Sequence, residues 1–410
     1  MTPTLYLRLA LMAFLHYFVW SCWFNTLNLY IGGNASKGGL GFEGWQIGLA
    51  YGTTAIGAIF SPFIIGIIAD RFFSAQRLLG VLHITGAALL WWISQQTSFG
   101  SFYPWLIVYT LTYMAGHGLI NTITLTHTPN PAKWFPIVMT AATVGWICAG
   151  LLVSKLQFED NSGMFKLAAL IALLMGLYSF SLPNTPPKAE SGPTSLGKLL
   201  GFDAIKLLKE RSFAVFMICS FLICIPLSFY FTSTATFLKD TMGANAAAKM
   251  TLGQFSEIGF LLLLPFLLPR LGVKKILVIG MAAWALRFCL FAFTKEQPST
   301  AWMIYGGLLL HGVCYDFIFV MGRMYVDKIA KNEIRASAQG LHAFFTLGIG
   351  MFVGSWLAGI VEQKYTTVLA SGDKIHDWKA IWLVPAIMSA ALIPIFLALF
   401  REKPADTQDA

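Results

Sequence analysis

Charged side chains are scarce in this chain. Aspartate, glutamate, lysine and arginine make up 11% of its 410 residues, whereas soluble globular proteins carry about 25%. Hydrophobic residues make up 57%, and apolar runs of about twenty residues recur along the whole chain. So few charges cannot cover the surface of a soluble enzyme of this length. The composition therefore predicts an integral membrane protein.

Motifs for nucleotide hydrolysis, metal binding and disulfide formation are also missing. There is no phosphate-binding loop of the GxxxxGK[ST] type, which argues against ATP-driven transport, and no HExxH motif. The six cysteines all fall inside apolar runs, without metal-type or disulfide-type spacing. The stretch SGDKIHD at 371–377 is interpreted as a solvated external loop. We therefore expect no enzyme activity, no metal and no cofactor.

Twelve apolar segments have the length of membrane-spanning helices. They cover residues 7–31, 44–69, 76–96, 102–127, 134–157, 163–182, 212–238, 247–269, 273–294, 299–326, 335–361 and 378–401. The sequence thus predicts an all-α membrane protein of twelve transmembrane helices in two six-helix halves. Its expected parts are a bundle at 1–182, a linker at 183–211, a second bundle at 212–401 and a tail at 402–410. Within the linker, Leu196–Leu208 has the pattern of an amphipathic helix at the membrane surface.

The distribution of basic residues predicts the orientation. Of the 28 lysines and arginines, 18 fall on the side that holds both termini and the linker, and nine fall on the other side. Because positive charge is retained on the cytoplasmic side, both termini are expected in the cytoplasm. The net charge of +9 is thereby explained by topology, and no nucleic-acid partner is needed.

Two acidic residues interrupt the apolar spans. Glu257 lies in MTLGQFSEIGFLLLLPFLLP at 250–269, and Asp316 lies in LLLHGVCYDFIFVMG. A carboxylate in a bilayer costs several kcal/mol and is usually functional, so the pair predicts a proton or cation pathway. Gln254 shares a helix face with Glu257 and can help to hold a polyhydroxyl ligand. The alternative is a permanently protonated Glu257 that donates one interhelical hydrogen bond.

Arg287 is the lone basic residue within its span, and it is a candidate partner of Asp316. Such a buried ion pair either breaks during a transport cycle or forms a static bridge, and the sequence leaves both open. Two further spans carry polar or aromatic stripes at i, i+4 and i+7, which are typical of a cavity lining or a helix interface. The stripes are His16, Trp20 and Trp23, and His117, Asn121 and Thr124. Among the histidines, His16, His117, His311 and His342 are secondary candidates.

Short motifs along the chain resemble a known family. GIIADR at 66–71, followed by Arg77, resembles the loop 2–3 signature of the major facilitator superfamily. More specific pieces resemble the bacterial nucleoside:H⁺ symporter family. They are DRFFSAQ at 70–76, GLINTI at 118–123, LGQFSEI at 252–258, AWALRF at 283–288, YDF at 315–317 and IRASAQG at 334–340.

The resemblance implies the major facilitator fold and proton-coupled import of nucleosides by alternating access. It also implies a monomer in the bacterial inner membrane, with a small-molecule substrate, protons and the lipid bilayer as its only partners. Substrate-binding candidates are Gln254, Glu257, Asp316, Asn121, Thr143, Trp146, Ser228 and Met139. Candidates for proton coupling are Glu257, Asp316 and Arg287, and Asp70 and Arg71 are the gating candidates.

Two positions depart from the family pattern. Met139 occupies the place of an arginine in span 5, and Phe231 stands where a polar residue is expected in span 7. The alternative function is therefore proton-coupled symport of another small polar solute, such as a sugar or a glycosylated compound.

Overall fold

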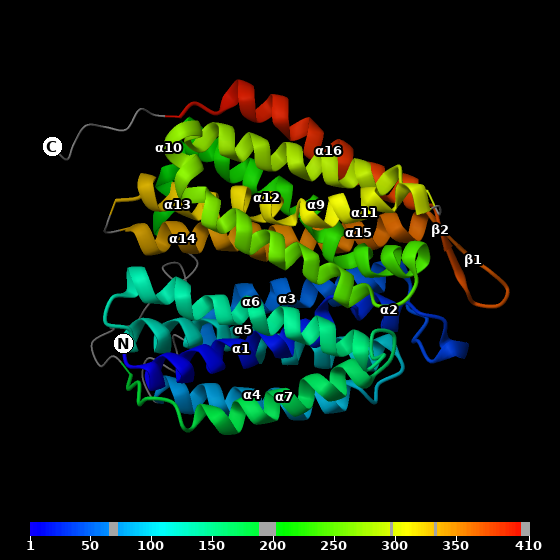
Figure 1. Cartoon of the computed structure of the whole chain (residues 1–410), viewed down its shortest axis with the longest axis horizontal. Helices are drawn as coiled ribbons and strands as arrows, with labels where there is room; N and C mark the ends of the chain where they lie inside the picture. Colours follow the sequence, from blue (N-terminus) through cyan, green and yellow to red (C-terminus); the bar gives the residue numbers. More distant parts are fainter. Residues whose placement is uncertain (65–72, 188–201, 296–297, 332–333, 403–410) are drawn as a thin grey trace. The chain divides into compact units, whose positions relative to one another are not determined.

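A computed structural model describes residues 1–64, 73–187, 202–295, 298–331 and 334–402 (Figure 1). The chain forms two compact units, which we treat separately. Unit 1 contains the described part of Met1–Leu196 together with Ser228–Thr251 and Met351–His376. Unit 2 contains the described parts of Gly197–Leu227, Leu252–Gly350 and Asp377–Ala410.

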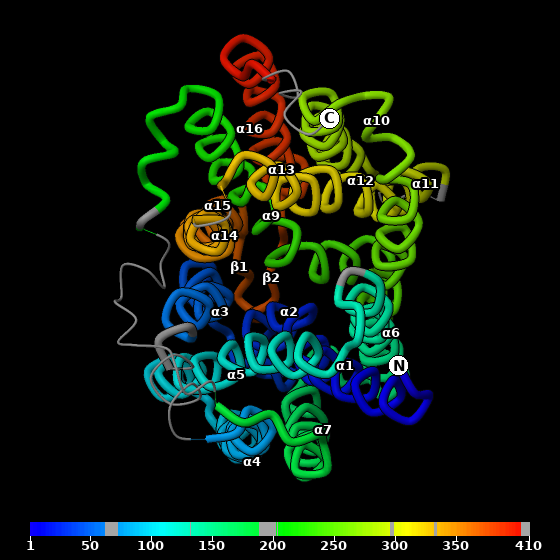
Figure 2. The backbone as a smooth tube through the Cα atoms, turned by 90° about the vertical axis from the view of Figure 1, so that its left-hand side faces the viewer, coloured from blue at the N-terminus to red at the C-terminus, as the bar shows by residue number. Residues whose placement is uncertain are grey.

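Unit 1 is built mainly from the first seven helices. They are α1 (Pro3–Phe24), α2 (Leu27–Ile31), α3 (Gly44–Ile64), α4 (Ala75–Ile93), α5 (Phe99–His127), α6 (Pro131–Lys155) and α7 (Gly163–Ser179), with a 3₁₀ turn at Ala35–Lys37. Helix α1 packs against α6, α4 packs against α7, and α3 packs against α5 (Figure 2). Local chemistry fixes the helix starts, because the side chains of Thr2 and Asn130 accept hydrogen bonds from the first turns of α1 and α6.

Three later helices contribute to unit 1. These are the second part of α9 (Arg211–Met242), the first residues of α10 (Ala246–Ala292) and the whole of α15 (Met351–Lys364). Helix α15 packs against α3 with almost no side chain between the backbones, since a Cβ atom on Gly44 would overlap the carbonyl of Gly359. A glycine is therefore required where these two helices meet.

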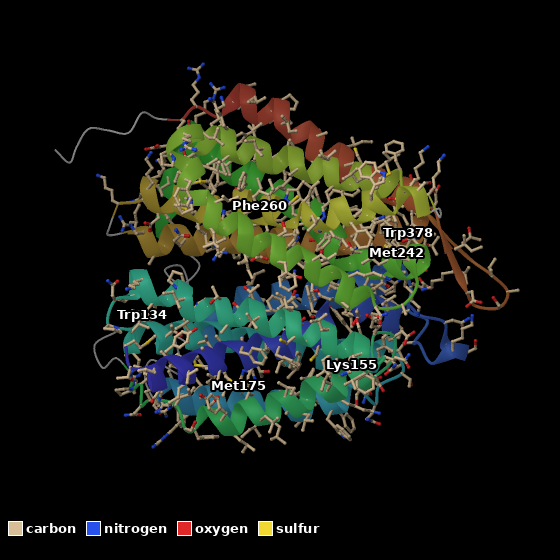
Figure 3. The ribbon with its side chains drawn as sticks, viewed as in Figure 1. Trp134, Lys155, Met175, Met242, Phe260 and Trp378 are labelled. Atoms are coloured by element: carbon tan, nitrogen blue, oxygen red, sulfur yellow. The ribbon has the colours of Figure 1, made fainter. Side chains whose placement is uncertain are left out.

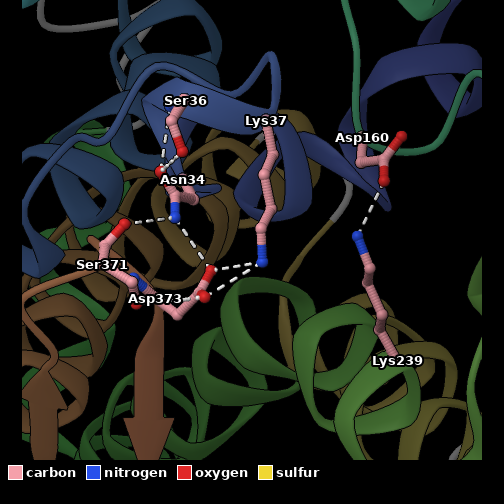
Figure 4. Close-up of polar contacts among 7 residues, drawn as sticks. All are labelled: Asn34, Ser36, Lys37, Asp160, Lys239, Ser371 and Asp373. Atoms are coloured by element: carbon pink, nitrogen blue, oxygen red, sulfur yellow. Dashed lines mark hydrogen bonds and ion pairs between the residues drawn. The ribbon is translucent and has the colours of Figure 1, made fainter.

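An antiparallel hairpin of β1 (Thr366–Val368) and β2 (Lys374–His376) follows α15. Its turn is exposed to solvent and is also held by side chains from another segment. Asp373 accepts hydrogen bonds from Lys37 Nζ at 2.8 Å and from Asn34 Nδ2 at 2.8 Å (Figure 4). A second ion pair, Lys239 to Asp160 at 2.7 Å, joins α9 to the segment after α6.

Unit 2 is dominated by α10 (Ala246–Ala292), which covers two predicted spans in one run of 47 residues. Gly272 breaks this helix into two arms, with φ of 72° and ψ of 169°. An L side chain rarely adopts a positive φ, so glycine suits the break. Glu402 accepts hydrogen bonds from the backbone N–H groups of Val273 and Lys274, both at 3.1 Å, and so caps the second arm.

The remaining elements of unit 2 are shorter. They are 3₁₀ turns at Phe202–Lys209 and Pro298–Thr300, α11 (Ala301–Leu309), α12 (His311–Tyr315), a π-helical segment at Asp316–Val320, α13 (Met321–Ile329), α14 (Arg335–Ala343), a π-helical segment at Phe344–Gly350 and α16 (Trp378–Leu399). The predicted amphipathic helix at Leu196–Leu208 is a 3₁₀ helix from Phe202 onward, and its earlier residues lie outside the described part.

Seven helical segments of the described chain are long and apolar enough to cross a membrane. They are Pro3–Ile31, Lys133–Lys155, Arg211–Met242, Ala246–Ala292, Ala301–Ile329, Arg335–Lys364 and Trp378–Leu399. Figure 3 shows the full length of α6, with Trp134 near one end and Lys155 at the other. Large apolar side chains such as Leu262 and Phe266 are exposed, at 68% and 67%, as expected for a lipid-facing surface. The structure is that of a helical, multi-pass membrane protein with one short hairpin.

Candidate functional site

Glu257 lies where the first arm of α10 meets α12. The two helices approach closely because small residues face each other. A Cβ atom on Gly253 would lie 3.0 Å from the Cβ of His311, and one on Gly312 would lie 2.8 Å from the backbone nitrogen of Glu257. The backbone N–H of Gly312 donates to Ser256 Oγ at 3.2 Å, and this hydroxyl donates to the carbonyl of Leu309. This packing brings Glu257 beside His311.

His311 stands between an acid and a base. Its Nε2 lies 3.8 Å from Oε2 of Glu257, which is within ion-pair range but too long for a hydrogen bond. Its Nδ1 lies 3.1 Å from Nη1 of Arg287, on the second arm of α10. The guanidinium also lies over the rings of Trp284 and Phe291, at 5.3 Å and 5.8 Å from their centroids.

Arg287 determines the tautomer of His311. A guanidinium has only donors and stays protonated in proteins, so Nδ1 of His311 must accept its hydrogen bond. The single hydrogen of a neutral imidazole then resides on Nε2, which is the nitrogen that faces Glu257. Since Arg287 is fully buried and the Glu257 side chain is 24% exposed, the acid is the accessible end of this three-residue chain.

Asp316 is the first residue of the π-helical segment and is fully buried. Within the described residues, neither of its carboxylate oxygens has a hydrogen-bond partner. The ion pair expected between Asp316 and Arg287 is wrong, because the guanidinium is directed at His311 instead. Five residues correspond to a rotation of about 140° on an α-helix, so Asp316 and His311 leave their element in different directions.

Gln254 precedes Glu257 by three residues on the same arm of α10, so the two share a helix face. It is 8% exposed, and its Oε1 has no hydrogen-bond partner in the described part of the chain. Buried polar atoms are normally paired, and an unpaired one at a helix face calls for an explanation such as a ligand or an ordered water. Unit 2 therefore holds Gln254, Glu257, His311 and Arg287 as one polar cluster, with Asp316 on the same helix run as His311.

The predicted residues of unit 1 gather around aromatic rings. Trp20 of α1 meets Trp146 of α6 edge to face, with ring centroids 5.3 Å apart. Phe24 lies 5.2 Å from Trp20 and 5.3 Å from Phe231 of α9. The indole nitrogens of Trp20 and Trp146 are both buried and have no partner among the described residues. This group of rings offers stacking surfaces and two unused N–H donors.

The other predicted residues of unit 1 have different surroundings. Thr143 is half-buried one turn before Trp146, and Asn121 is exposed on α5. Met139 is half-buried and packs against an apolar cluster that includes Leu9 and Val138. Ser228 is fully buried and donates its hydroxyl hydrogen bond to the carbonyl of Met351 at 3.3 Å.

The gating candidates Asp70 and Arg71 lie outside the described residues. Asp327 and Arg335 form a charge pair at 3.3 Å between α13 and α14. The described residues contain no group of histidine, cysteine, aspartate and glutamate side chains that could hold a metal ion.

Sequence reasoning missed two buried acids, Glu159 and Glu362, which are 8% and 4% exposed. Glu362 near the end of α15 accepts hydrogen bonds from Asn28 Nδ2 at 2.9 Å and from Ser233 Oγ at 2.5 Å. It stands one residue beyond the predicted span 335–361. The apolar run MFVGSWLAGIV directly before it was the available signal. His311 was recognised only as a secondary candidate, because its neighbours on α10 are distant in sequence.

Known proteins resemble this protein along almost its whole length. A family model described as nucleoside H⁺ symporter matches residues 3–405. The putative nucleoside transporter YegT of Escherichia coli (strain K12) is 39% identical over 407 residues, which cover 96% of this chain and 93% of YegT. The nucleoside permease NupG of the same organism is 32% identical over 420 residues, which cover 98% of each chain.

The fold is shared as well. The crystal structure of the nucleoside transporter NupG matches with a TM-score of 0.86 at 30% identity, covering 97% of this chain and 100% of that chain. A crystal structure of a POT family transporter matches with a TM-score of 0.73, covering 98% and 97%, and at 14% identity it shows the fold alone. Sequence and structure together place this chain in the nucleoside H⁺ symporter family, a family of multi-pass membrane transporters.

Proposed function

We propose that this protein imports nucleosides across a bacterial inner membrane by proton-coupled symport. Family membership and the names of its relatives support the substrate class. The observation that carries the coupling is the chain from Glu257 through His311 to Arg287 in unit 2. It joins an accessible carboxylate to a fixed positive charge through an imidazole of defined tautomer.

Protonation of Glu257 can change its partner from His311 to a ligand. An ionised Glu257 is attracted by the Nε2–H of His311 and by the charge of Arg287 behind it. A protonated Glu257 loses this attraction and gains an O–H donor, so it is free to turn toward a ligand together with Gln254. Asp316, buried without a partner, is the second proton-coupling group, since an unpaired charge there would be costly.

Unit 1 supplies groups suited to a flat ring. Trp20 and Trp146 present aromatic faces and unused indole N–H donors, which can stack on a base and bond to its oxygens. Thr143 is half-buried on α6, the helix of Trp146, and Asn121 is exposed on α5. Ser228 and Met139 remain proposed members of the site, and Asp70 with Arg71 remains the proposed cytoplasmic gate.

The finer architecture belongs to the same proposal. We propose twelve membrane crossings with both termini in the cytoplasm, halves at 1–182 and 212–401, and a monomer without enzyme activity or a nucleic-acid partner. A helix or helical run of the described chain covers at least part of every predicted span, which supports the number twelve. The excess of lysine and arginine on one side supports the orientation.

Uptake by purified protein in proteoliposomes tests the proposal. We expect a nucleoside panel to accumulate when a proton gradient is imposed, and accumulation to stop when the gradient is collapsed. Glu257→Gln should lose accumulation while keeping nucleoside exchange, because binding survives and coupling does not. Glu43→Gln, which changes an exposed acid that accepts a hydrogen bond from Trp45, is the matched control and should accumulate normally. Accumulation by Glu257→Gln that equals the control would refute the coupling assignment.

One observation favours a second candidate substrate class. Met139 packs into an apolar cluster, and the basic residues of α6 are confined to its ends, at Lys133 and Lys155. Aromatic platforms without a nearby cation also suit sugars and glycosylated compounds. Uptake of sugars without uptake of any nucleoside in the same assay would select this alternative.

A further inference from the structure

Three histidines from three helices form a chain in the core of unit 1. His16 of α1 is the centre. Its Nδ1 lies 2.9 Å from Nε2 of His83 on α4, and its Nε2 lies 2.7 Å from Nδ1 of His117 on α5. The His16 ring stacks on Tyr113 at 4.4 Å and 6°, and the Tyr113 hydroxyl donates to the His16 carbonyl at 2.8 Å. The neighbours therefore fix the central ring.

The two short contacts restrict where the hydrogens can be. Each N···N contact holds one hydrogen, since two would clash and none would leave two lone pairs facing each other. Three neutral imidazoles carry three hydrogens, so one is left for an outer nitrogen. It resides either on His117 Nε2 or on His83 Nδ1, and moving between these two forms reverses both internal bonds.

The outer nitrogens face different surroundings. Neither His83 Nδ1 nor His117 Nε2 has a hydrogen-bond partner within the part of the chain that the structure describes. His83 borders a cavity of about 10 Å³, close to the volume needed by one water, which can donate to or accept from Nδ1. The His117 end is only partly buried and lies 5.3 Å from the ring of Trp20.

No charged side chain of the neighbouring helices lies beside the three histidines. The titratable groups in ring contact with it are the neutral phenols of Tyr17 and Tyr113, and Tyr109 borders the cavity at His83. The described lysines and arginines of α1, α4, α6 and α7 lie within two turns of the helix ends, at Arg8, Arg77, Lys133, Lys155 and Lys166, and α3 and α5 have none. The three histidines can therefore change between their two tautomeric forms without carrying a net charge.

We propose that His117 is a substrate-contacting residue whose Nε2 bonds to a hydroxyl of the sugar moiety of the nucleoside, and that His16 and His83 are positioning residues that let this nitrogen either donate or accept. A hydroxyl is the matching ligand group, because it also donates and accepts. Trp20, which touches both His117 and Trp146, connects the site to the proposed base platform. The inference rests on the proposed function and adds a residue that the sequence treated as secondary.

Binding of uridine and its 2′-, 3′- and 5′-deoxy analogues to purified protein tests His117. In the wild type, loss of the contacted hydroxyl should weaken binding about 5- to 30-fold, the effect of one hydrogen bond left unmade. His117→Phe should weaken the binding of uridine by a similar factor. It should bind the matching deoxy analogue with the affinity of the wild type. His117→Gln retains an amide at this point and should restore part of the difference. His127→Phe, which changes a half-buried histidine at the end of α5 that lies 2.9 Å from the Thr185 hydroxyl, is the control and should keep the wild-type ratio.

The positioning role needs a readout that simple packing would not change. Solid-state NMR of ¹⁵N-labelled histidine rings reports the tautomer of each residue. On addition of uridine, the signals of His83 should change in the same titration as those of His117, although His83 does not touch the ligand. In His117→Phe this response of His83 should disappear.

The outcomes separate the two levels of the argument. A wild type that binds no nucleoside refutes the proposed function and this inference with it. A wild type that binds uridine, with His117→Phe weakening all analogues equally or none, refutes the contact alone. Tautomers of His83 that stay unchanged while His117 responds refute the positioning role.

Discussion

Replacement of His311 by three different residues can separate its two contacts. His311→Asn places an amide oxygen near the position of Nδ1, so it can accept from Arg287 but does not reach Glu257. His311→Gln places its amide near the position of Nε2, so it can reach Glu257 but does not accept from Arg287. His311→Phe removes both contacts while keeping a ring. The three variants therefore test the tautomer argument directly.

The structure sets the expected magnitudes. Arg287 is fully buried, so loss of the His311 acceptor removes a hydrogen bond from a desolvated, charged side chain. A buried donor without a partner costs about 1–3 kcal/mol. His311→Phe and His311→Gln should lose this amount of unfolding free energy, whereas His311→Asn should lose less than about 1 kcal/mol. The stacking of Arg287 on Trp284 and Phe291 remains in all three variants and limits the loss.

Two assays on the same preparations give the answer. Denaturant or thermal unfolding in detergent measures the stability difference, and proton-driven accumulation in proteoliposomes measures coupling. We expect His311→Asn to be stable but poorly coupled, and His311→Gln to be less stable but better coupled. The reasoning fails if His311→Asn is as unstable as His311→Phe, or if it concentrates nucleoside as the wild type does.

Two other changes give separate predictions. Met139→Arg should tighten nucleoside binding about 10-fold or more by equilibrium binding, because it adds a charge-assisted hydrogen bond, and an unchanged affinity would mean that the pocket differs more widely. Hydrogen bonds from Lys37 and Asn34 lower the pKa of Asp373 to about 2, so this contact is present above about pH 4 and is lost only as the pH falls through 2. Hydrogen exchange of residues 366–376, corrected for intrinsic rates, should then be constant from about pH 8 to pH 4, and Asp373→Asn should raise it throughout.

The sequence predicted the helices well because each apolar run has its own length and boundary signals. The starts of α1 and α6 lie a few residues before the predicted limits at 7 and 134, because a capping side chain precedes each helix and a proline is its first residue. The break between the predicted spans 247–269 and 273–294 is also present, at Gly272. What periodicity could not provide is the π-helical turn at Asp316, because one extra residue in a turn leaves no mark on composition.

The sequence named candidate residues for the site, but it did not predict which of them are in contact. Gln254 and Glu257 share a face by helix periodicity alone. The pairing of Arg287 with His311 instead of Asp316 depends on how the second arm of α10 packs against α12, which is a tertiary property. The partners of Glu362 are distant in sequence for the same reason, since Asn28 lies more than three hundred residues before it.

The break at Gly272 also sets a register. Glu257 stands fifteen residues before this glycine and Arg287 stands fifteen residues after it. Two arms of equal length rise about 22 Å from the same bend, so the acid and the base lie at the same distance along their arms from the bend. Inserting one residue into either arm would turn its distal part by about 100° and raise it by about 1.5 Å, and the two charges would no longer meet at one histidine. The number of residues between Gly272 and each of the two charged residues can therefore change only if both arms change together.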